Sequence, residues 1–161
     1  MIDFAAVLRV LSEAGVQFII VGGAAATAHG AARLTQDLDV VYRRDADNLR
    51  RLAQALQPQE PYLRGVQPGL PFVLDEETLR TGLNFTLVSK LGDLDLLGEI
   101  TGGGGFDDLL EHSIEIELFG TRCHCLGLRK LIEVKRAAGR PKDLEALAEL
   151  EELLSRATDS E

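Results

Sequence analysis

The chain has no apolar run that approaches a membrane span, and its N-terminal segment lacks the features of a secretory signal peptide. A transmembrane helix needs roughly 20 consecutive apolar residues, so the sequence predicts no membrane anchor. The opening segment MIDFAAVLRVLSEAG has the pattern of an amphipathic helix with acidic residues and no cleavage-type ending. We therefore expect a cytoplasmic protein.

Cysteine is scarce, and the two cysteines that are present, Cys123 and Cys125, flank His124. Two cysteines separated by one residue on a strand share a face and are poorly placed for a disulfide, and no CxxC motif completes a zinc set. The pattern therefore favours two buried thiols in a core strand over a metal site, with His124 pointing outward.

Basic residues are outnumbered, with 17 Lys and Arg against 26 Asp and Glu, a net charge of -9 and a pI near 4.8. Binding to nucleic acid is driven mainly by Lys and Arg that neutralise phosphates, so this balance disfavours a broad nucleic-acid surface. A length of 161 residues with 45% apolar residues suits one globular domain. We expect that domain to cover residues 1–156 and residues 157–161 to form a disordered tail.

Hydrophobic periodicity predicts one α/β or α+β domain, with Asp3 capping the first helix and Gly15 ending it. Helices are predicted at residues 4–14, 23–29, 45–57, 106–112, 128–138 and 141–155. Strands are predicted at residues 17–21, 38–42, 84–88, 91–97, 113–118 and 122–126. Residues 58–71 hold four of the five prolines and are predicted to form a surface excursion, and the glycines at 102–105 a mobile connection.

The most informative pattern is the pair Asp37 and Asp39 in LTQDLDVV, which follows a strand-like VQFIIV that ends in two glycines. Alternate side chains of a strand point to the same face, so the two carboxylates project together while Leu38 and Val40 turn into the core. Neighbouring like charges raise the pKa of one carboxyl group, and a cation relieves the repulsion. The pair therefore predicts a site for Mg²⁺ or Mn²⁺.

A second acidic strand, LGDLDLLGEI, supplies a third candidate ligand. Asp93 and Asp95 share one strand face, with leucines on the other, so this strand can lie beside the first. A solvated acidic face is the alternative. Asp95 lies deeper in the apolar run, which makes it the better candidate for a partly buried ligand, and Asp93 is expected to stay solvated.

The segment VGGAAATAHGAARLTQDLDVV resembles the signature of the nucleotidyltransferase superfamily that includes DNA polymerase β. That signature has a glycine turn after a strand, a short helix, Asp-x-Asp on the next strand and a third acid on a later strand, matched here by Asp95. The C-terminal LRKLIEVKRAAGRPKDLEALAEL is further similar to a minimal bacterial branch with AbiEii-type toxin nucleotidyltransferases. The likeness runs from about residue 17 to 150 and implies a single domain with a mixed β-sheet flanked by helices.

The resemblance implies an enzyme that moves NMP from an NTP, such as ATP, to a hydroxyl acceptor and releases pyrophosphate. The acceptor would be a small molecule, an RNA end or a protein. Two metal ions about 4 Å apart would lie between the carboxylates, and the glycine turn would hold the triphosphate. The implied catalytic residues are Asp37, Asp39, Asp95 and Lys135, with the three aspartates as metal ligands. The implied nucleotide-binding residues are Gly22, Gly23, Arg33, Thr35, Arg140 and Lys142.

Several of these residues have structural alternatives. Lys135 also suits a solvated helix face, Thr35 suits a turn cap, and His29 suits a local hydrogen bond. Asp143 fits either a first-turn acid of the last helix or the orienting partner of Lys135. At the level of function, the alternatives are a nonenzymatic module that binds a nucleotide or a cognate protein partner, and a Mn²⁺-dependent glycosyltransferase. The glycosyltransferase leaves the glycine turn unexplained.

Overall fold

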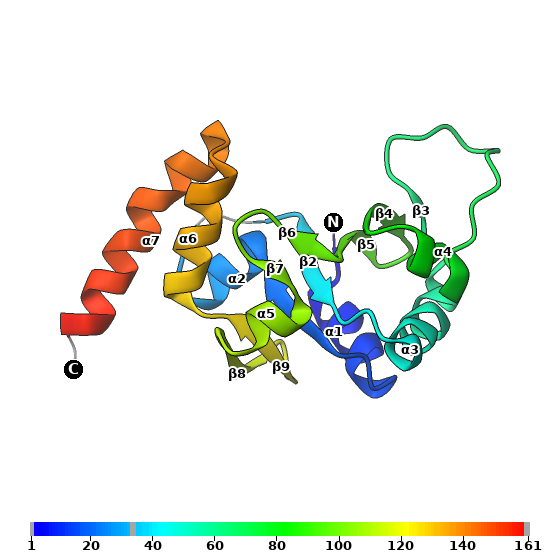
Figure 1. The fold of residues 1–161 in the computed structure, drawn as a ribbon, viewed down its shortest axis with the longest axis horizontal. Helices are drawn as coiled ribbons and strands as arrows, with labels where there is room; N and C mark the ends of the chain where they lie inside the picture. The colour runs from blue at the N-terminus through cyan, green and yellow to red at the C-terminus, as the bar shows by residue number, and fades with distance from the viewer. Residues whose placement is uncertain (1, 33–34, 160–161) are drawn as a thin grey trace.

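The computed structural model describes residues 2–32 and 35–159 (Figure 1). Its helices are α1 (Phe4–Glu13), α2 (Gly22–Ala28), α3 (Ala46–Leu56), the short 3₁₀ helix η1 (Gln57–Gln59), α4 (Glu76–Thr81), α5 (Phe106–Leu110), α6 (Leu128–Ala138) and α7 (Pro141–Asp159). Its strands are β1 (Phe18–Val21), β2 (Asp37–Tyr42), β3 (Tyr62–Leu63), β4 (Asn84–Ser89), β5 (Gly92–Leu97), β6 (Glu99–Ile100), β7 (Gly104–Gly105), β8 (Ser113–Leu118) and β9 (Thr121–Leu126).

Seven strands form one mixed sheet in the order β3-β4-β5-β2-β1-β9-β8. β2 runs parallel to β5 and β1 runs parallel to β9, whereas the other neighbours are antiparallel. At the left of Figure 1, α6 packs along α7 and against α2, while α1 packs with α3 and β9. The predicted single domain with a mixed sheet flanked by helices is confirmed.

The core lies around the central strands. All four residues of β1 are buried, as expected for a strand covered on both faces. In β2 and β5, Leu38, Val40 and Leu94 are buried, so the aspartates that alternate with them project to the opposite face. Cys123 and Cys125 are buried free thiols in β9, which confirms their predicted place in the core.

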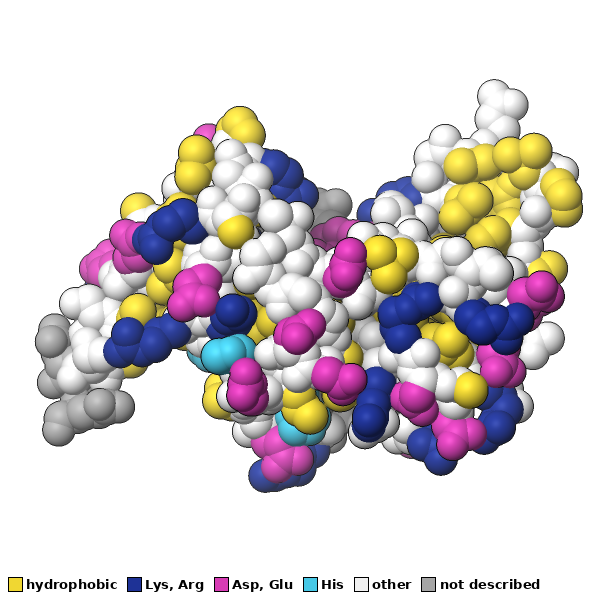
Figure 2. Space-filling view, in the orientation of Figure 1, with side chains coloured by type: hydrophobic (Ala, Val, Ile, Leu, Met, Phe, Trp, Pro, Cys, Tyr) yellow, Lys and Arg dark blue, Asp and Glu magenta, His cyan; other side chains and the backbone are white. Residues whose placement is uncertain are grey.

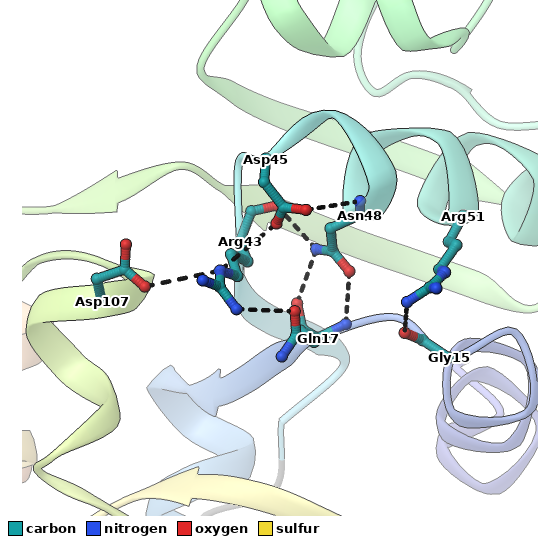
Figure 3. Close-up of polar contacts among 7 residues, drawn as sticks. All are labelled: Gly15, Gln17, Arg43, Asp45, Asn48, Arg51 and Asp107. Atoms are coloured by element: carbon teal, nitrogen blue, oxygen red, sulfur yellow. Dashed lines mark hydrogen bonds and ion pairs between the residues drawn. The ribbon is translucent and has the colours of Figure 1, made fainter.

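A buried amide fastens α3 to the sheet (Figure 3). Asn48 accepts a hydrogen bond from the Gln17 backbone N–H at 2.7 Å and donates to the backbone carbonyls of Gln17 and Arg43 at 3.0 and 2.8 Å. Buried polar groups are stable only when they are paired in this way. The contacts join the residue before β1 to the residue after β2 and thereby fix the two strands that carry the glycine turn and the acidic pair.

The helix ends follow the expected capping chemistry, with one difference at the C-terminus. The Asp3 carboxylate accepts a hydrogen bond from the Ala6 N–H at 3.0 Å, and Gly15 takes a positive φ of 74° just after α1. α7 continues to Asp159, so residues 157–159 are helical where a disordered tail is predicted. Residues 160–161 lie outside the described part of the chain.

The proline-rich segment is more than a surface excursion. It contains η1 and β3, and β3 pairs antiparallel with β4 to form an edge of the sheet. α4 follows it and is also absent from the predicted elements; its N-cap, Asp75, accepts a hydrogen bond from the Thr78 N–H at 2.8 Å. A strand of two residues and a helix of six are too short to show a hydrophobic period.

The glycine run forms a hairpin rather than a mobile connection. β6 and β7 pair antiparallel. A Cβ on Gly102 would collide with Ala137 of α6, and a Cβ on Gly103 would lie 2.9 Å from Ile100 and 3.0 Å from Leu109. The glycines therefore allow close packing of the hairpin against α5 and α6.

No helix in the described ranges is long and apolar enough to cross a membrane.

Candidate functional site

Three carboxylates converge at the centre of the sheet. The parallel register of β2 and β5 places Asp37 beside Asp93 and Asp39 beside Asp95. One carboxylate oxygen from each of Asp37, Asp39 and Asp95 lies within 4.8 Å of the other two. The Asp93 side chain is 43% exposed against 18% for Asp95, in agreement with the predicted choice between them.

The electrostatics of this cluster favour a cation. Burial, a hydrogen bond with Asp95 and the negative charges of Asp37 and Asp95 raise the pKa of Asp39 to about 8, against a smaller opposing effect of Lys142. Burial also raises the pKa of Asp95, against the opposing effects of its hydrogen bond with Asp39 and the Arg64 charge. The Oδ1 atom of Asp39 is buried and has no hydrogen-bond partner among the described residues. Divalent hard cations prefer such carboxylate oxygens, so these residues fit Mg²⁺ or Mn²⁺.

The glycine turn touches the acidic cluster directly. Gly22 is the first residue of α2, directly after β1, and has a φ of +63°; a Cβ at this position would collide with the carboxylate of Asp39. A Cβ on Gly23 would lie 2.9 Å from the Thr35 hydroxyl oxygen. Both glycines therefore let the backbone approach side chains that line the acidic cluster, and any side chain would fill that space.

We expect Gly22→Ala to lower the free energy of unfolding by about 1–3 kcal/mol, because alanine disfavours a positive φ and its Cβ displaces the Asp39 carboxylate. Mg²⁺ affinity should fall as well. Gly120→Ala is the matched control, since Gly120 has a φ of +82° with nothing within 4 Å of its added Cβ. Urea unfolding and Mg²⁺ titration check both variants, and equal effects on Mg²⁺ affinity would contradict a special role for Gly22.

Thr35 contacts the first aspartate. Its hydroxyl lies 3.0 Å from the backbone oxygen of Asp37 and 3.1 Å from Oδ1 of the same residue. These contacts orient the Asp37 side chain at the start of β2, which agrees with a structural role for Thr35, and its predicted part in nucleotide binding stays a prediction. Arg33, which is also among the implied nucleotide-binding residues, lies outside the described residues. His29 lies 2.8 Å from the Leu126 carbonyl at the end of β9, a hydrogen bond to a residue distant in sequence where a local one was predicted.

The C-terminal helices bring a cationic group to the same cleft. Lys135 of α6 lies 3.7 Å from Oδ1 of Asp143, and its side chain is only 15% exposed, which excludes a solvated helix face. Arg140 donates to both carboxylate oxygens of Asp143, at 2.6 and 3.3 Å. Burial opposes ionisation of Asp143, but the hydrogen bond and charge of Arg140 and the charge of Lys135 hold its pKa below the usual value. Asp143 is thus both a first-turn acid of α7 and the partner of Lys135.

Two adjoining cavities surround these groups. One has a volume of about 480 Å³ and is lined by both glycines, the three aspartates and the basic residues Lys135, Arg140 and Lys142. The other has about 260 Å³, shares Gly22, Asp39 and Lys135 with the first, and has an apolar wall on α6. Figure 2 shows the molecule hollowed between the α6–α7 pair and the part that carries residues 64–75.

Arg64 is a site residue that no sequence pattern predicts. Its Nη2 atom lies 2.9 Å from Oδ1 of Asp95 and 2.7 Å from the Leu87 carbonyl, and its Nε lies 3.4 Å from Oδ2 of Asp93. Arg64 follows β3 in the proline-rich segment, where no local pattern distinguishes it. Only the pairing of β3 with β4 brings it to the acidic cluster.

Comparisons with known proteins concern the fold. No family model and no curated protein matches the sequence. The lincosamide antibiotic adenylyltransferase LnuA, in its lincomycin-bound form, superposes with a TM-score of 0.61 and 14% identity over 93% of this chain and 95% of that one. TM1012 of Thermotoga maritima, provisionally assigned as a nucleotidyltransferase, gives 0.58 and 15% over 92% and 94%. An antigenic nucleotidyltransferase-like protein of Paracoccidioides brasiliensis gives 0.55 and 16% over 91% and 72%.

These likenesses show that the chain has the nucleotidyltransferase fold, which confirms the superfamily resemblance at the level of the fold. Identities of 14–16% are too low to carry a substrate from those proteins to this one. None of the three is named as an AbiEii-type toxin, so that narrower resemblance stays a prediction.

Proposed function

We propose that this protein is a metal-dependent nucleotidyltransferase that moves NMP from an NTP to a hydroxyl acceptor and releases pyrophosphate. The observation that carries the proposal is the convergence of Asp37, Asp39 and Asp95, with an orphaned buried oxygen on Asp39, beside the Gly22 backbone. The fold supports it, because three solved structures with this fold carry the name of nucleotidyltransferase or a likeness to one.

Asp37, Asp39 and Asp95 would hold Mg²⁺ or Mn²⁺. A bound divalent ion supplies positive charge that stabilises the charged phosphate oxygens during the displacement. Arg64 contacts Oδ1 of Asp95 and Thr35 contacts Oδ1 of Asp37, and contacts of this kind fix the orientation of ligating carboxylates. We expect this arrangement to keep the three oxygens pointed into the cleft.

The triphosphate is proposed to lie between the glycine turn and the start of α7. The Gly22 and Gly23 backbone lines one wall of the 480 Å³ cavity, and Lys135, Arg140 and Lys142 line the same cavity. The Lys142 charge lowers the pKa of Asp39, and the Asp39 charge raises the pKa of Arg140, so these cations act on the acidic cluster. They are suited to neutralise the pyrophosphate as it leaves.

The chemistry proposed for the chain's own groups is a single displacement. The acceptor oxygen forms a bond to the α-phosphorus, and the bond from that phosphorus to the bridging oxygen breaks, with its electron pair leaving on pyrophosphate. The hydroxyl proton passes to the carboxylate of Asp95, the ligand farthest from the glycine turn along the strand order.

The direct test is release of pyrophosphate from each of the four NTPs with Mg²⁺ or Mn²⁺, beside calorimetric titration of a nonhydrolysable NTP. Metal-dependent release with at least one NTP supports the proposal. NTP binding without transfer to any acceptor would favour the nonenzymatic module that binds a nucleotide. Failure of every NTP to bind would refute both the transferase and that nucleotide-binding module, and would leave the module that binds a protein partner.

A variant of Lys135 tests whether α6 belongs to the site. Lys135→Met keeps the packing of the side-chain stem but removes its charge, so NTP affinity should fall by about 1–3 kcal/mol. The free energy of unfolding should change little, because Arg140 still pairs with Asp143. Calorimetric titration and urea unfolding measure the two quantities.

Lys130→Met is the matched control for this variant. Lys130 lies on the same helix, is 19% exposed and pairs with Glu133 at 3.2 Å, but it lines neither of the two cavities. Its NTP affinity should stay within about 0.5 kcal/mol of the wild-type value. Equal affinities of the two variants would remove Lys135 from the site.

A further inference from the structure

We propose that the acceptor is a small uncharged hydroxyl compound with an apolar surface. It binds beside the three carboxylates, on the side where β4 and residues 64–75 lie; these residues are called the β3–α4 loop. The inference rests on the proposed nucleotidyl transfer. It adds the place and the chemical class of the acceptor.

The side of attack follows from the order of the strands. The attacking and leaving oxygens of a phosphoryl displacement lie roughly in line through phosphorus. The glycine turn ends β1, which neighbours β2 on the side away from β5. Pyrophosphate held at that turn leaves toward β1. The acceptor therefore approaches from the opposite side of the carboxylates, where β5, β4 and β3 follow one another in the sheet.

The cavity reaches this side. Thr86 of β4 lies directly beside Asp95 in the strand pairing, is exposed, and lines the same 480 Å³ cavity as Gly22 and Gly23. An acceptor hydroxyl above Thr86 therefore has open access to the Asp95 carboxylate. Arg64 holds Oδ1 of that carboxylate at 2.9 Å, so the proton of the acceptor would pass to Oδ2.

The β3–α4 loop begins on the face of the sheet that carries the aspartates. Tyr62 of β3 pairs with Val88 of β4, and Val88 pairs with Asp93 of β5. Directly opposite residues of neighbouring strands project to the same face, and Asp93 shares its face with Asp95. The Tyr62 side chain therefore projects on the catalytic face, one row away from Asp95.

Tyr62 holds the loop above this face. Its hydroxyl lies 3.0 Å from the backbone oxygen of Gln67 and 3.2 Å from that of Leu70. Its ring meets the Phe72 ring edge-on, with centroids 6.1 Å apart. These contacts give the loop a defined shape beside the cleft, where Figure 1 shows it rising opposite the α6–α7 pair.

The composition of the loop indicates the class of acceptor. Residues 65–74, GVQPGLPFVL, carry no charge in a chain that is 27% charged. Leu70 and Val73 are 60% and 67% exposed, the highest values among the exposed large hydrophobic residues that the structure describes. Large exposed apolar side chains mark a candidate binding surface, and Figure 2 shows the part of the molecule that carries this loop beside the hollow. An RNA end would need cations for its phosphates, which these ten residues lack.

Amide NMR of the full chain with two matched glucosides tests the inference. Octyl β-D-glucoside below its micelle concentration and methyl β-D-glucoside share their hydroxyls and differ only in the apolar tail. With a nonhydrolysable ATP analogue and Mg²⁺ bound, we expect the octyl compound to shift the amide signals of Thr86 and the loop. The methyl compound should bind at least about tenfold more weakly, the effect of burying about two methylene groups.

Paired variants locate the effect. Leu70→Ser combined with Val73→Ser removes two exposed apolar side chains and leaves the core intact. The control, Ile114→Ser, removes a side chain that is 45% exposed on β8, at the opposite edge of the sheet. We expect the double variant to lose the shifts produced by octyl glucoside while its affinity for the ATP analogue stays within about twofold. The Ile114 control should keep both properties.

Four results would overturn the inference: equal binding of the two glucosides, shifts confined to other surfaces, stronger loop shifts with a short RNA, or a wild-type dimer that the double variant converts to a monomer. The last would identify the loop as a contact between copies of this chain. Failure of the ATP analogue to bind the wild type is a separate result, because it overturns the proposed nucleotidyl transfer itself.

Discussion

Asp39→Asn is expected to reduce metal-dependent NMP transfer by about three orders of magnitude, because several kcal/mol of charge stabilisation by the metal disappears with the ligand. Burial and the neighbouring carboxylates raise the pKa of Asp39 to about 8, and its Oδ1 has no hydrogen-bond partner among the described residues. Asp37→Asn should act in the same direction. Pyrophosphate release and Mn²⁺ titration measure the two losses.

Glu115→Gln serves as the control for this variant. It also removes a strand carboxylate, but Glu115 lies on β8 at the edge of the sheet and pairs with Arg122 at 3.6 Å. NMP transfer and Mn²⁺ affinity should be unchanged in the Glu115→Gln variant. Wild-type activity in Asp39→Asn would show that the acidic cluster has no part in the reaction.

The metal-free protein is expected to lose stability as the pH rises from 5 to about 8.5. Burial and the neighbouring carboxylates raise the pKa of Asp39 from 3.8 to about 8 in the folded state, so the folded protein binds more protons than the unfolded chain between these values. Stability from this group is fully present below the unfolded pKa and is lost as the pH rises through the folded pKa. One such group gives a slope of at most about 1.4 kcal/mol per pH unit.

Urea unfolding in a chelator, repeated at each pH, measures this slope. Asp39→Asn should remove most of it, and saturating Mg²⁺ should flatten it in the wild type, because a bound cation favours the ionised carboxylate. The range ends near pH 8.5 because burial raises the pKa of Cys125 to about 12, so this thiol adds its own dependence at higher pH. A slope that Asp39→Asn leaves intact would assign the effect to other groups.

Local pattern was sufficient for the long elements. Helix α6 has the predicted bounds, and so does strand β8, because each shows its period over a full element. β3 and α4 were missed because they are too short to show a period, and β3 exists only through its hydrogen bonds to β4. The glycine hairpin was misjudged for a related reason, since Gly102 is required by a close contact with Ala137 of α6, which is distant in sequence.

The sequence by itself determined which side chains share a face. The spacing of Asp37 and Asp39, and of Asp93 and Asp95, requires each pair to project together from a strand whose other face is apolar, since side chains of a strand alternate. It also identified the glycine turn, because Gly22 and Gly23 interrupt an apolar strand. These inferences depend only on local geometry.

Only the tertiary structure decided what surrounds those side chains. The register of β2 against β5 joins the acidic pairs into one cluster, and the edge strand β3 brings Arg64 to Asp95. The packing of α6 along α7 buries Asp143 against Lys135. Contacts of this kind join residues far apart in the chain, and their free energy depends on burial and on the distances between charges. Neither quantity is present in a local sequence pattern.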